Sequence, residues 1–175
     1  MRKVIFLDID GVLNDLAWNE KTKHLPDYHD INPDKVKLLA NLVHQTKAEL
    51  VLSSTWRCLA ATDTTEEHPV YTYLRKSLQE ENLIIQDHTP QIPSERPEEI
   101  RQWLIRQSSP ETIRFVSLDD DWNEQEYQKV GLINCLIHTE YFSLNGGLLP
   151  EHIKIAVKML NGTKPQWIKT KGGSS

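Results

Sequence analysis

The sequence contains only two cysteines, Cys58 and Cys135, among its 175 residues, and it has no CxxC pair. This excludes a disulfide scaffold and a zinc ribbon and is typical of a protein from a reducing compartment. No apolar run approaches the about 20 residues that a membrane-spanning helix needs. The N-terminus also lacks the long apolar stretch and the cleavage site of a signal peptide. We therefore expect a cytoplasmic protein with no membrane association.

Positive charge is not in excess, because 20 Lys and Arg stand against 25 Asp and Glu, for a formal net charge of −5. Tight, salt-driven binding of long nucleic acid is therefore not expected. The sequence has no GxxxxGK and no GxGxxG motif, so neither a P-loop nor a dinucleotide fingerprint is present. It contains no internal repeat, and nothing in it implies an obligate protein partner.

Strand-like and helix-like segments alternate along the chain, which predicts an α/β fold. Each strand is a short β-rich apolar run, and each helix carries apolar residues at helical spacing. The predicted strands are 4–7, 49–52, 83–85, 113–118 and 133–137, and the predicted helices are 32–45, 69–81, 97–107, 124–129 and 150–160. We expect one Rossmann-like domain over residues 1–162, with a mainly parallel five-stranded sheet flanked by helices. A flexible polar tail is expected over residues 163–175.

Polar side chains follow several of the predicted strands where each strand ends. In a parallel sheet the ligand site lies outside these carboxyl ends. Clustered carboxylates repel one another unless a cation joins them, and ligands made of oxygen alone favour Mg²⁺. An arginine can neutralise a phosphate, and a carboxylate can attack phosphorus. The residues concerned are Asp8, Asp10, Ser53, Ser54, Arg96, Asp119, Asp120 and Asp121.

These residues resemble the four motifs of the haloacid dehalogenase (HAD) superfamily. The segment DIDGVLN, from Asp8 to Asn14, resembles motif I, and Ser53 or Ser54 resembles motif II. Arg96 takes the place of the motif III Lys or Arg, and the pair Asp119-Asp120 resembles motif IV. The resemblance covers about residues 3–160. More narrowly, LDIDGVLN, SSTWR and LDDD are similar to the phosphatase-type HAD domains of bacterial and phage RNA-repair (Swiss Army Knife) proteins.

The resemblance implies a role for each matching residue. Asp8 would be the nucleophile that forms an aspartyl phosphate, and Asp10 the general acid and then the base. Arg96 would screen Asp8 from the charge of the phosphoryl group. Asp8, the Asp10 carbonyl, Asp119 and Asp120 would bind Mg²⁺. The substrate phosphate would contact the set Gly11, Ser53, Ser54 and Arg57.

Two windows could hold the cap domain that gives many HAD enzymes their specificity. Residues 14–31 have the length of a flap and hold no two full helices, and residues 86–95 are shorter and contain Pro90 and Pro93. We therefore expect an open site without a large cap. An open site favours a phosphate carried on something large, such as a nucleotide or the terminus of a nucleic acid.

Several of these residues also have structural interpretations. Asp119 to Asp121 could cap the following helix, Ser53 or Ser54 could cap a helix, and Arg96 could be a surface residue. Trp56 fits a stacking platform for the substrate and a core position equally well, whereas Trp103 is expected in the core.

At the level of function, three alternatives to a nucleotide phosphatase stay open. These are a phosphoprotein phosphatase, a phosphotransferase of the same fold, and a non-catalytic phosphate-binding module.

Overall fold

A computed structural model describes residues 1–25, 29–93 and 95–168 of the chain. Its five strands form one sheet in the order β3-β2-β1-β4-β5, and every neighbouring pair is parallel. The strands are β1 (Lys3–Leu7), β2 (Glu49–Leu52), β3 (Ile85–His88), β4 (Arg114–Asp119) and β5 (Leu136–His138). The predicted α/β, Rossmann-like fold is confirmed, and the sheet is parallel throughout.

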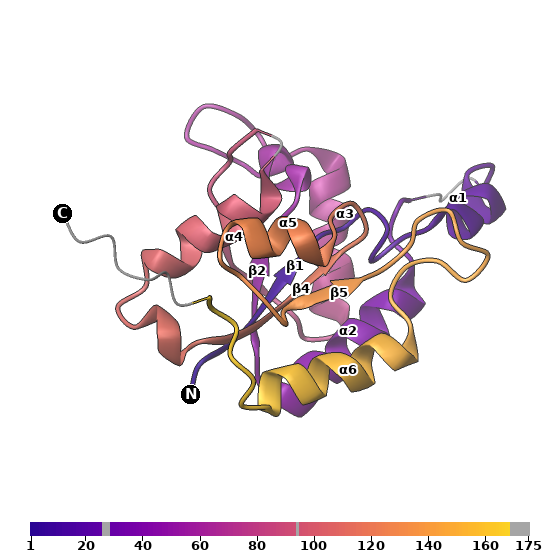
Figure 1. The fold of residues 1–175 in the computed structure, drawn as a ribbon. Coiled ribbons are helices and arrows are strands. Elements are labelled where there is room, and N and C mark those ends of the chain that lie inside the picture. The colour runs from indigo at the N-terminus through magenta and orange to yellow at the C-terminus, as the bar shows by residue number, and fades with distance from the viewer. Residues whose placement is uncertain (26–28, 94, 169–175) are drawn as a thin grey trace.

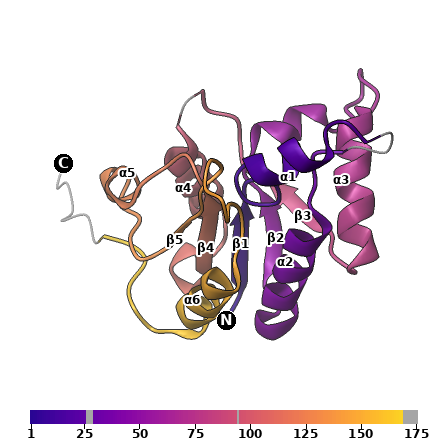
Figure 2. The same ribbon diagram turned by 90° about the vertical axis from the view of Figure 1, so that its right-hand side faces the viewer.

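Helices cover both faces of this sheet (Figures 1 and 2). The first face packs against α2 (Pro33–Thr46), α3 (Pro69–Glu80) and α6 (Pro150–Asn161). The second face packs against α4 (Arg96–Ile105) and α5 (Glu124–Lys129). Two short 3₁₀ helices, η1 (Thr55–Leu59) and η2 (Pro110–Thr112), lie in connections, and α1 (Leu16–Thr22) stands away from the two layers.

The central strand β1 is buried on both faces because its apolar side chains alternate between them. Ile5 and Leu7 belong to the core under α2, α3 and α6, whereas Val4 and Phe6 belong to the core under α4 and α5. The ring of Phe6 meets the Trp103 ring edge to face, with 5.3 Å between the ring centroids. Trp103 is therefore a core residue, as expected. Burying each such side chain contributes about 1.5–3 kcal/mol, so β1 is firmly anchored.

The two edge strands differ from the prediction. The third strand was expected at 83–85, but it is formed by Ile85–His88. Asn82, which follows α3, has φ 58°, and Leu83 packs into the core instead of beginning the strand. An edge strand tolerates polar residues, and the polar residues 86–88 therefore do not show the apolar pattern that predicts a strand. The fifth strand was expected from residue 133 but begins at Leu136, because Asn134 has φ 52°, a left-handed conformation that interrupts a strand.

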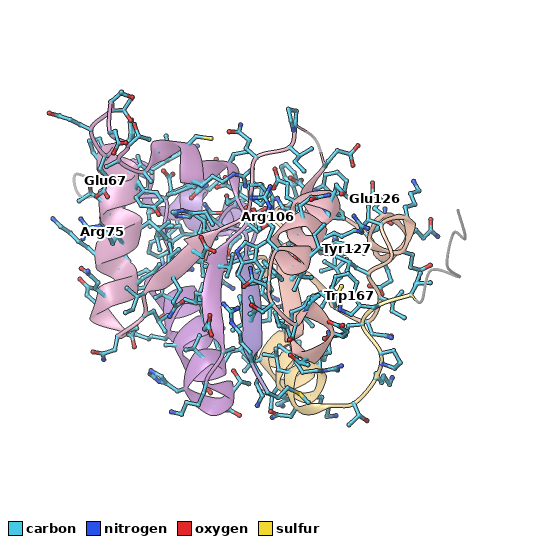
Figure 3. All side chains as sticks on the ribbon, turned by 90° about the vertical axis from the view of Figure 1, so that its left-hand side faces the viewer. Glu67, Arg75, Arg106, Glu126, Tyr127 and Trp167 are labelled. Atoms are coloured by element: carbon cyan, nitrogen blue, oxygen red, sulfur yellow. The ribbon has the colours of Figure 1, made fainter. Side chains whose placement is uncertain are left out.

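The polar tail also differs from the expectation over its first residues. Gln166 is buried, and its side-chain amide accepts a hydrogen bond from the Phe115 N–H and donates one to the Phe115 carbonyl. Trp167 forms an antiparallel bridge with Leu132 and lies on the same side of the molecule as Tyr127 (Figure 3). The packed part of the chain therefore extends to Ile168 rather than to residue 162. Residues 169–175 of the predicted tail lie outside the described residues.

The two windows for a cap hold little regular structure where they are described. The first contains the single helix α1, and the second begins inside β3 and ends just before α4. Residues 26–28 of the first window and residue 94 of the second lie outside the described residues. Within the described ranges, no helix is both long enough and apolar enough to cross a membrane.

Candidate active site

The candidate site is built at the carboxyl edge of the three central strands. Asp8 directly follows β1, and its N–H donates to the Leu118 carbonyl of β4 over 3.0 Å. Ser53 follows β2, and its N–H donates to the Leu7 carbonyl over 2.8 Å. Asp119 is the last residue of β4. Because these backbone bonds continue the ladders of the sheet, the side chains at the edge are held by the most rigid part of the fold.

Asp8 is a buried carboxylate, 4% exposed, with partners for both oxygens. Its Oδ1 accepts a hydrogen bond from the Ile9 N–H at 2.8 Å, and its Oδ2 lies 2.9 Å from Nη1 of Arg96. Burial raises the pKa of Asp8, whereas Arg96 and a hydrogen bond from the Ser54 side chain act to lower it. A buried anion of this kind is stable only with such partners.

Arg96, the first residue of α4, links two strands through one nitrogen. Its Nη1 lies 2.9 Å from Asp8 Oδ2 and 2.7 Å from Asp119 Oδ2. Burial opposes the guanidinium charge, but Asp8 and Asp119 outweigh it and raise the pKa of Arg96 above its ordinary value. Arg96 is therefore a buried, charged residue of the site, and its interpretation as a surface residue is wrong.

The three consecutive aspartates after β4 have different surroundings. Asp119 is fully buried, its Oδ1 accepts a hydrogen bond from the Asp121 N–H, and burial together with repulsion from Asp8 raises its pKa to about 7. Burial and repulsion from Asp121 and Asp8 raise the pKa of Asp120 to about 6. Helix α5 is capped by Asn123 rather than by an aspartate. The interpretation of these aspartates as a helix cap is therefore wrong.

Three of these carboxylates have the arrangement of a metal site. Asp8, Asp119 and Asp120 each offer an oxygen, and these oxygens all lie within 4.8 Å of one another. Gly11 has φ 68°, and a Cβ there would lie 2.1 Å from Cγ of Asp120, so only glycine leaves Asp120 its place. Oxygen-only ligands suit a hard divalent cation such as Mg²⁺. The donor set therefore fits the predicted ion.

Asp10 points to a different environment from Asp8, although only one residue separates them. It is exposed, and its Oδ1 accepts a hydrogen bond from Nδ2 of Asn14 at 2.9 Å. Its Oδ2 accepts one from the indole Nε1 of Trp56, also at 2.9 Å. The carboxylate is thus held in one orientation by two neutral donors. Trp56 is only 8% exposed and packs in the core, so it is a core residue whose polar edge reaches the site.

The predicted phosphate contacts have existing partners in this structure. The Gly11 N–H donates to Oδ1 of Asn14 at 2.9 Å. The Ser54 side chain caps η1 and also bonds Asp8, whereas the Ser53 hydroxyl lies 3.4 Å from that of Thr89. Of the two serines, Ser54 is therefore the one that touches the buried carboxylate. Phosphate binding by this set stays a prediction.

Arg57 is held by an acidic residue that the sequence analysis did not consider. Its Nη2 lies 2.6 Å from Oε1 of Glu99, and its Nη1 donates to the Ser54 carbonyl at 2.9 Å. Glu99 is buried on α4, three residues after Arg96, and also accepts a hydrogen bond from the Ile92 N–H. Asn14 and Glu99 are thus the supporting residues that sequence reasoning missed. The only sequence signal for a supporting role was spacing: Asn14 lies four residues after Asp10, and Glu99 lies three residues after Arg96.

The geometry described above agrees with the comparison of the chain with known families. The family model of the HAD domain in Swiss Army Knife RNA repair proteins matches residues 4–142. The chain belongs to this HAD family. Neither the search of curated proteins nor the search of solved structures gave a match. Family membership supports a phosphohydrolase of the HAD type, and the acidic cluster of this HAD domain can bind the metal that the family generally uses.

Proposed function

We propose that this HAD domain is a Mg²⁺-dependent phosphomonoester hydrolase that acts through an aspartyl phosphate on Asp8, with nucleotide or polynucleotide-end phosphates as substrates. One observation carries the proposal. The Arg96 guanidinium bridges the Asp8 and Asp119 carboxylates, Asp120 completes a cluster of three acids with them, and Asp10, two residues after Asp8, is held by Trp56 and Asn14. In the proposed reaction these residues would supply the nucleophile, the compensating cation, the metal ligands and the second acid, and their position at one edge of the sheet supports the proposal.

The reaction then has two balanced steps. In the first, an Asp8 oxygen forms a bond to phosphorus, the bond from phosphorus to the ester oxygen breaks, and Asp10 gives its proton to the departing oxygen. In the second, Asp10 takes a proton from water, which attacks phosphorus, and the bond between phosphorus and Asp8 breaks to release phosphate. Asp8, Asp119 and Asp120 would hold Mg²⁺, which supplies charge neutralisation at the phosphoryl oxygens when bound.

Arg96 and the two donors to Asp10, Trp56 and Asn14, have supporting roles in this reaction. Arg96 stays charged and offers its fixed guanidinium to the oxygens of Asp8, which limits repulsion between the nucleophile and an incoming phosphate. Trp56 and Asn14 keep Asp10 from rotating away. Asp10 is exposed whereas Asp8 is buried, so the proton carrier faces the side from which solvent and leaving group arrive.

The substrate class is supported by the small size of the inserted segments and by the family. The described part of the first window holds only the seven-residue α1, too little to enclose a small metabolite. The matching family consists of HAD domains in RNA repair proteins. The net charge of −5 favours modest affinity centred on the terminus over binding along a polymer.

The test is phosphate release from a panel of substrates at equal ionic strength, with Mg²⁺ or with EDTA. The panel contains oligonucleotides with a 5′ or 3′ phosphate, mononucleotides, sugar phosphates and phosphopeptides. We expect EDTA-sensitive release that is most efficient for the nucleotides, and none from Asp8→Asn. A much higher kcat/KM for a small sugar phosphate would contradict the open-site argument, and activity that survives EDTA would contradict the metal.

A further inference from the structure

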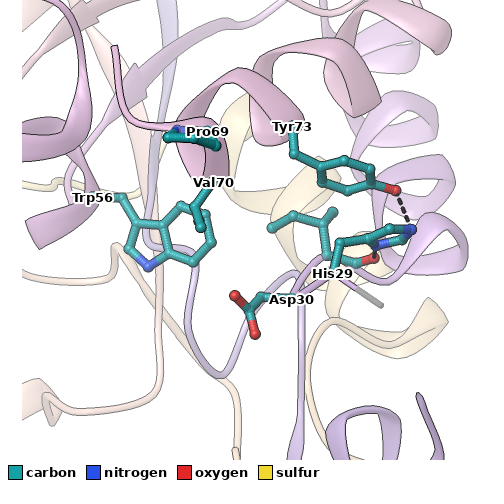
Figure 4. Close-up of a pocket in the computed structure, with 7 residues that line it drawn as sticks. His29, Asp30, Trp56, Pro69, Val70 and Tyr73 are labelled. Carbon is teal, nitrogen blue, oxygen red and sulfur yellow. Dashed lines mark hydrogen bonds between the residues drawn. The ribbon is translucent and has the colours of Figure 1, made fainter. Parts of the chain in front are cut away.

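A pocket of about 570 Å³ lies beside Trp56, between the start of α3 and the segment that precedes α2 (Figure 4). Trp56 forms one wall, together with Pro69 and Val70, and Tyr73 and His29 form the other. None of these side chains belongs to the metal cluster, and the reaction described above uses none of their exposed surfaces.

The pocket is connected to the site through Trp56. The indole contributes its ring to the pocket and its Nε1–H to Oδ2 of Asp10, at 2.9 Å. Asp10 is the group that protonates the departing oxygen in the proposed reaction. One indole therefore joins the pocket to the carboxylate that would protonate the departing oxygen.

The opposite wall is a preformed aromatic surface. The rings of Tyr73 and His29 are stacked, with 3.7 Å between centroids and 22° between planes, and the Tyr73 hydroxyl is hydrogen-bonded to Nε2 of His29. Nδ1 of His29 is hydrogen-bonded to the Ile31 carbonyl, and the Trp18 indole donates to the His29 carbonyl. Because both ring nitrogens of His29 are engaged, His29 offers an occupant of the pocket aromatic carbon rather than a free ring donor.

The charge around the pocket limits its occupant. Asp30 lies at the pocket, Asp10 is close by, and no lysine or arginine is among the described lining residues. A second phosphate is disfavoured beside these acids, whereas an uncharged ring is not. A nucleobase on its sugar is such a ring, and it suits the aromatic lining of the pocket.

We infer that this pocket is the subsite for the nucleobase nearest the phosphate that is removed. The inference rests on the proposed function and adds to it the part of the substrate that is recognised. It predicts that the base contributes to turnover by stacking, which for single bases on aromatic side chains corresponds to about 5- to 150-fold.

The experiment compares kcat/KM for adenosine 3′- and 5′-phosphate with kcat/KM for ribose 5-phosphate, which has no base. We expect a ratio of about 10 or more for the wild type, in keeping with base stacking. Tyr73→Leu, which removes the ring, and Val70→Trp, which fills the pocket, should bring the ratio close to one. Tyr73→Phe keeps the ring and should keep most of the ratio. Lys76→Leu, at an exposed position of the same helix, is the matched control and should keep the wild-type ratio.

A binding measurement separates this inference from the proposed function. Adenosine without phosphate is titrated into Asp8→Asn while tryptophan fluorescence is followed, with and without Tyr73→Leu. A wild-type ratio near one would overturn the subsite and the nucleotide preference, whereas EDTA-sensitive hydrolysis that is lost in Asp8→Asn would leave the proposed phosphatase mechanism standing. Adenosine binding that is lost in Tyr73→Leu, without hydrolysis of any nucleotide, would support the subsite and overturn the function. A phosphotyrosine peptide hydrolysed as well as the nucleotides, with the same loss in Tyr73→Leu, would overturn the assignment to a nucleobase.

Discussion

Arg96 makes the strongest energetic prediction, because it is the cation that balances two buried carboxylates. Its side chain is 10% exposed, and its Nη1 contacts Asp8 at 2.9 Å and Asp119 at 2.7 Å. Arg96→Met keeps the length and apolar stem of the side chain but leaves both carboxylates without their partner. Removing one member of a buried ion pair costs about 3–5 kcal/mol, and we expect a loss of this size in the free energy of unfolding at pH 8 in EDTA.

Two conditions should reduce this loss in the free energy of unfolding. At pH 5.5 Asp119, whose pKa is already raised to about 7 by burial and by Asp8, takes up a proton and no longer needs a cation. Saturating Mg²⁺ should likewise restore part of the stability, because it provides the missing positive charge. The same carboxylates that are unpaired in the variant would hold the ion.

The assay is urea unfolding followed by circular dichroism, at both pH values and with EDTA or Mg²⁺. Arg101→Met is the matched control, since Arg101 lies on the same helix but forms a much more solvent-accessible pair with Glu98, at 3.3 Å and with side chains 37% and 27% exposed. Such surface pairs contribute about 0–1 kcal/mol. If Arg96→Met lost no more stability than this control at pH 8 in EDTA, Arg96 would not balance the buried charge and its assigned role would be wrong.

The other predictions concern the aspartates. Asp8→Asn should abolish phosphate release while its circular dichroism spectrum stays native, because an amide does not attack phosphorus; a rate above a few per cent of wild type would exclude the covalent route. Asp10→Asn should lower kcat by about 10²- to 10⁴-fold, and less for nitrophenyl phosphate, whose leaving group needs no proton; an equal loss for both substrates would leave Asp10 a positioning role. In EDTA, Asp119→Asn should gain Tm relative to wild type as the pH rises from 5 to 8. The reason is that folded Asp119, with its pKa raised to about 7, keeps a proton that the unfolded chain releases near pH 4, so ionisation costs stability only in the wild type. A constant difference in Tm would refute the raised pKa.

The sequence predicted most of the fold because the central elements carry strong local signals. The sequence pattern correctly located three features: the apolar run of β1, the Asn32 cap followed by Pro33 at the start of α2, and the strand that ends at Leu52. The bounds of the edge strands were predicted wrongly because each edge strand pairs with a neighbour on one side only, so its amino-acid composition is less constrained. In β3 the polar Gln86 and Asp87 take part in contacts that no local pattern reveals, with Gln86 accepting from the Leu50 N–H.

In the site, the chain positions were predictable and the contacts were not. The rule that ligands bind at the carboxyl ends of parallel strands was enough to bring Asp8, Arg96 and Asp119 together. The bonds from Trp56 to Asp10 and from Arg57 to Glu99 each join residues more than 40 positions apart and depend on how η1 packs. Such contacts follow from three-dimensional packing, which a single sequence does not encode in any short motif.

Nη1 of Arg96 contacts both Asp8 and Asp119, and this bridge has a consequence for the order in which the domain is synthesised. Asp8 directly follows β1, whereas Arg96 and Asp119 are synthesised only after β1, β2 and β3. Until α4 has been made, the nascent chain has the Asp8 carboxylate at the end of an apolar strand without its partner Arg96, and Asp119 follows only with β4. The bridge that Arg96 forms between Asp8 and Asp119 therefore requires both α4 and β4, and we expect a fragment that stops before β4 to lack it.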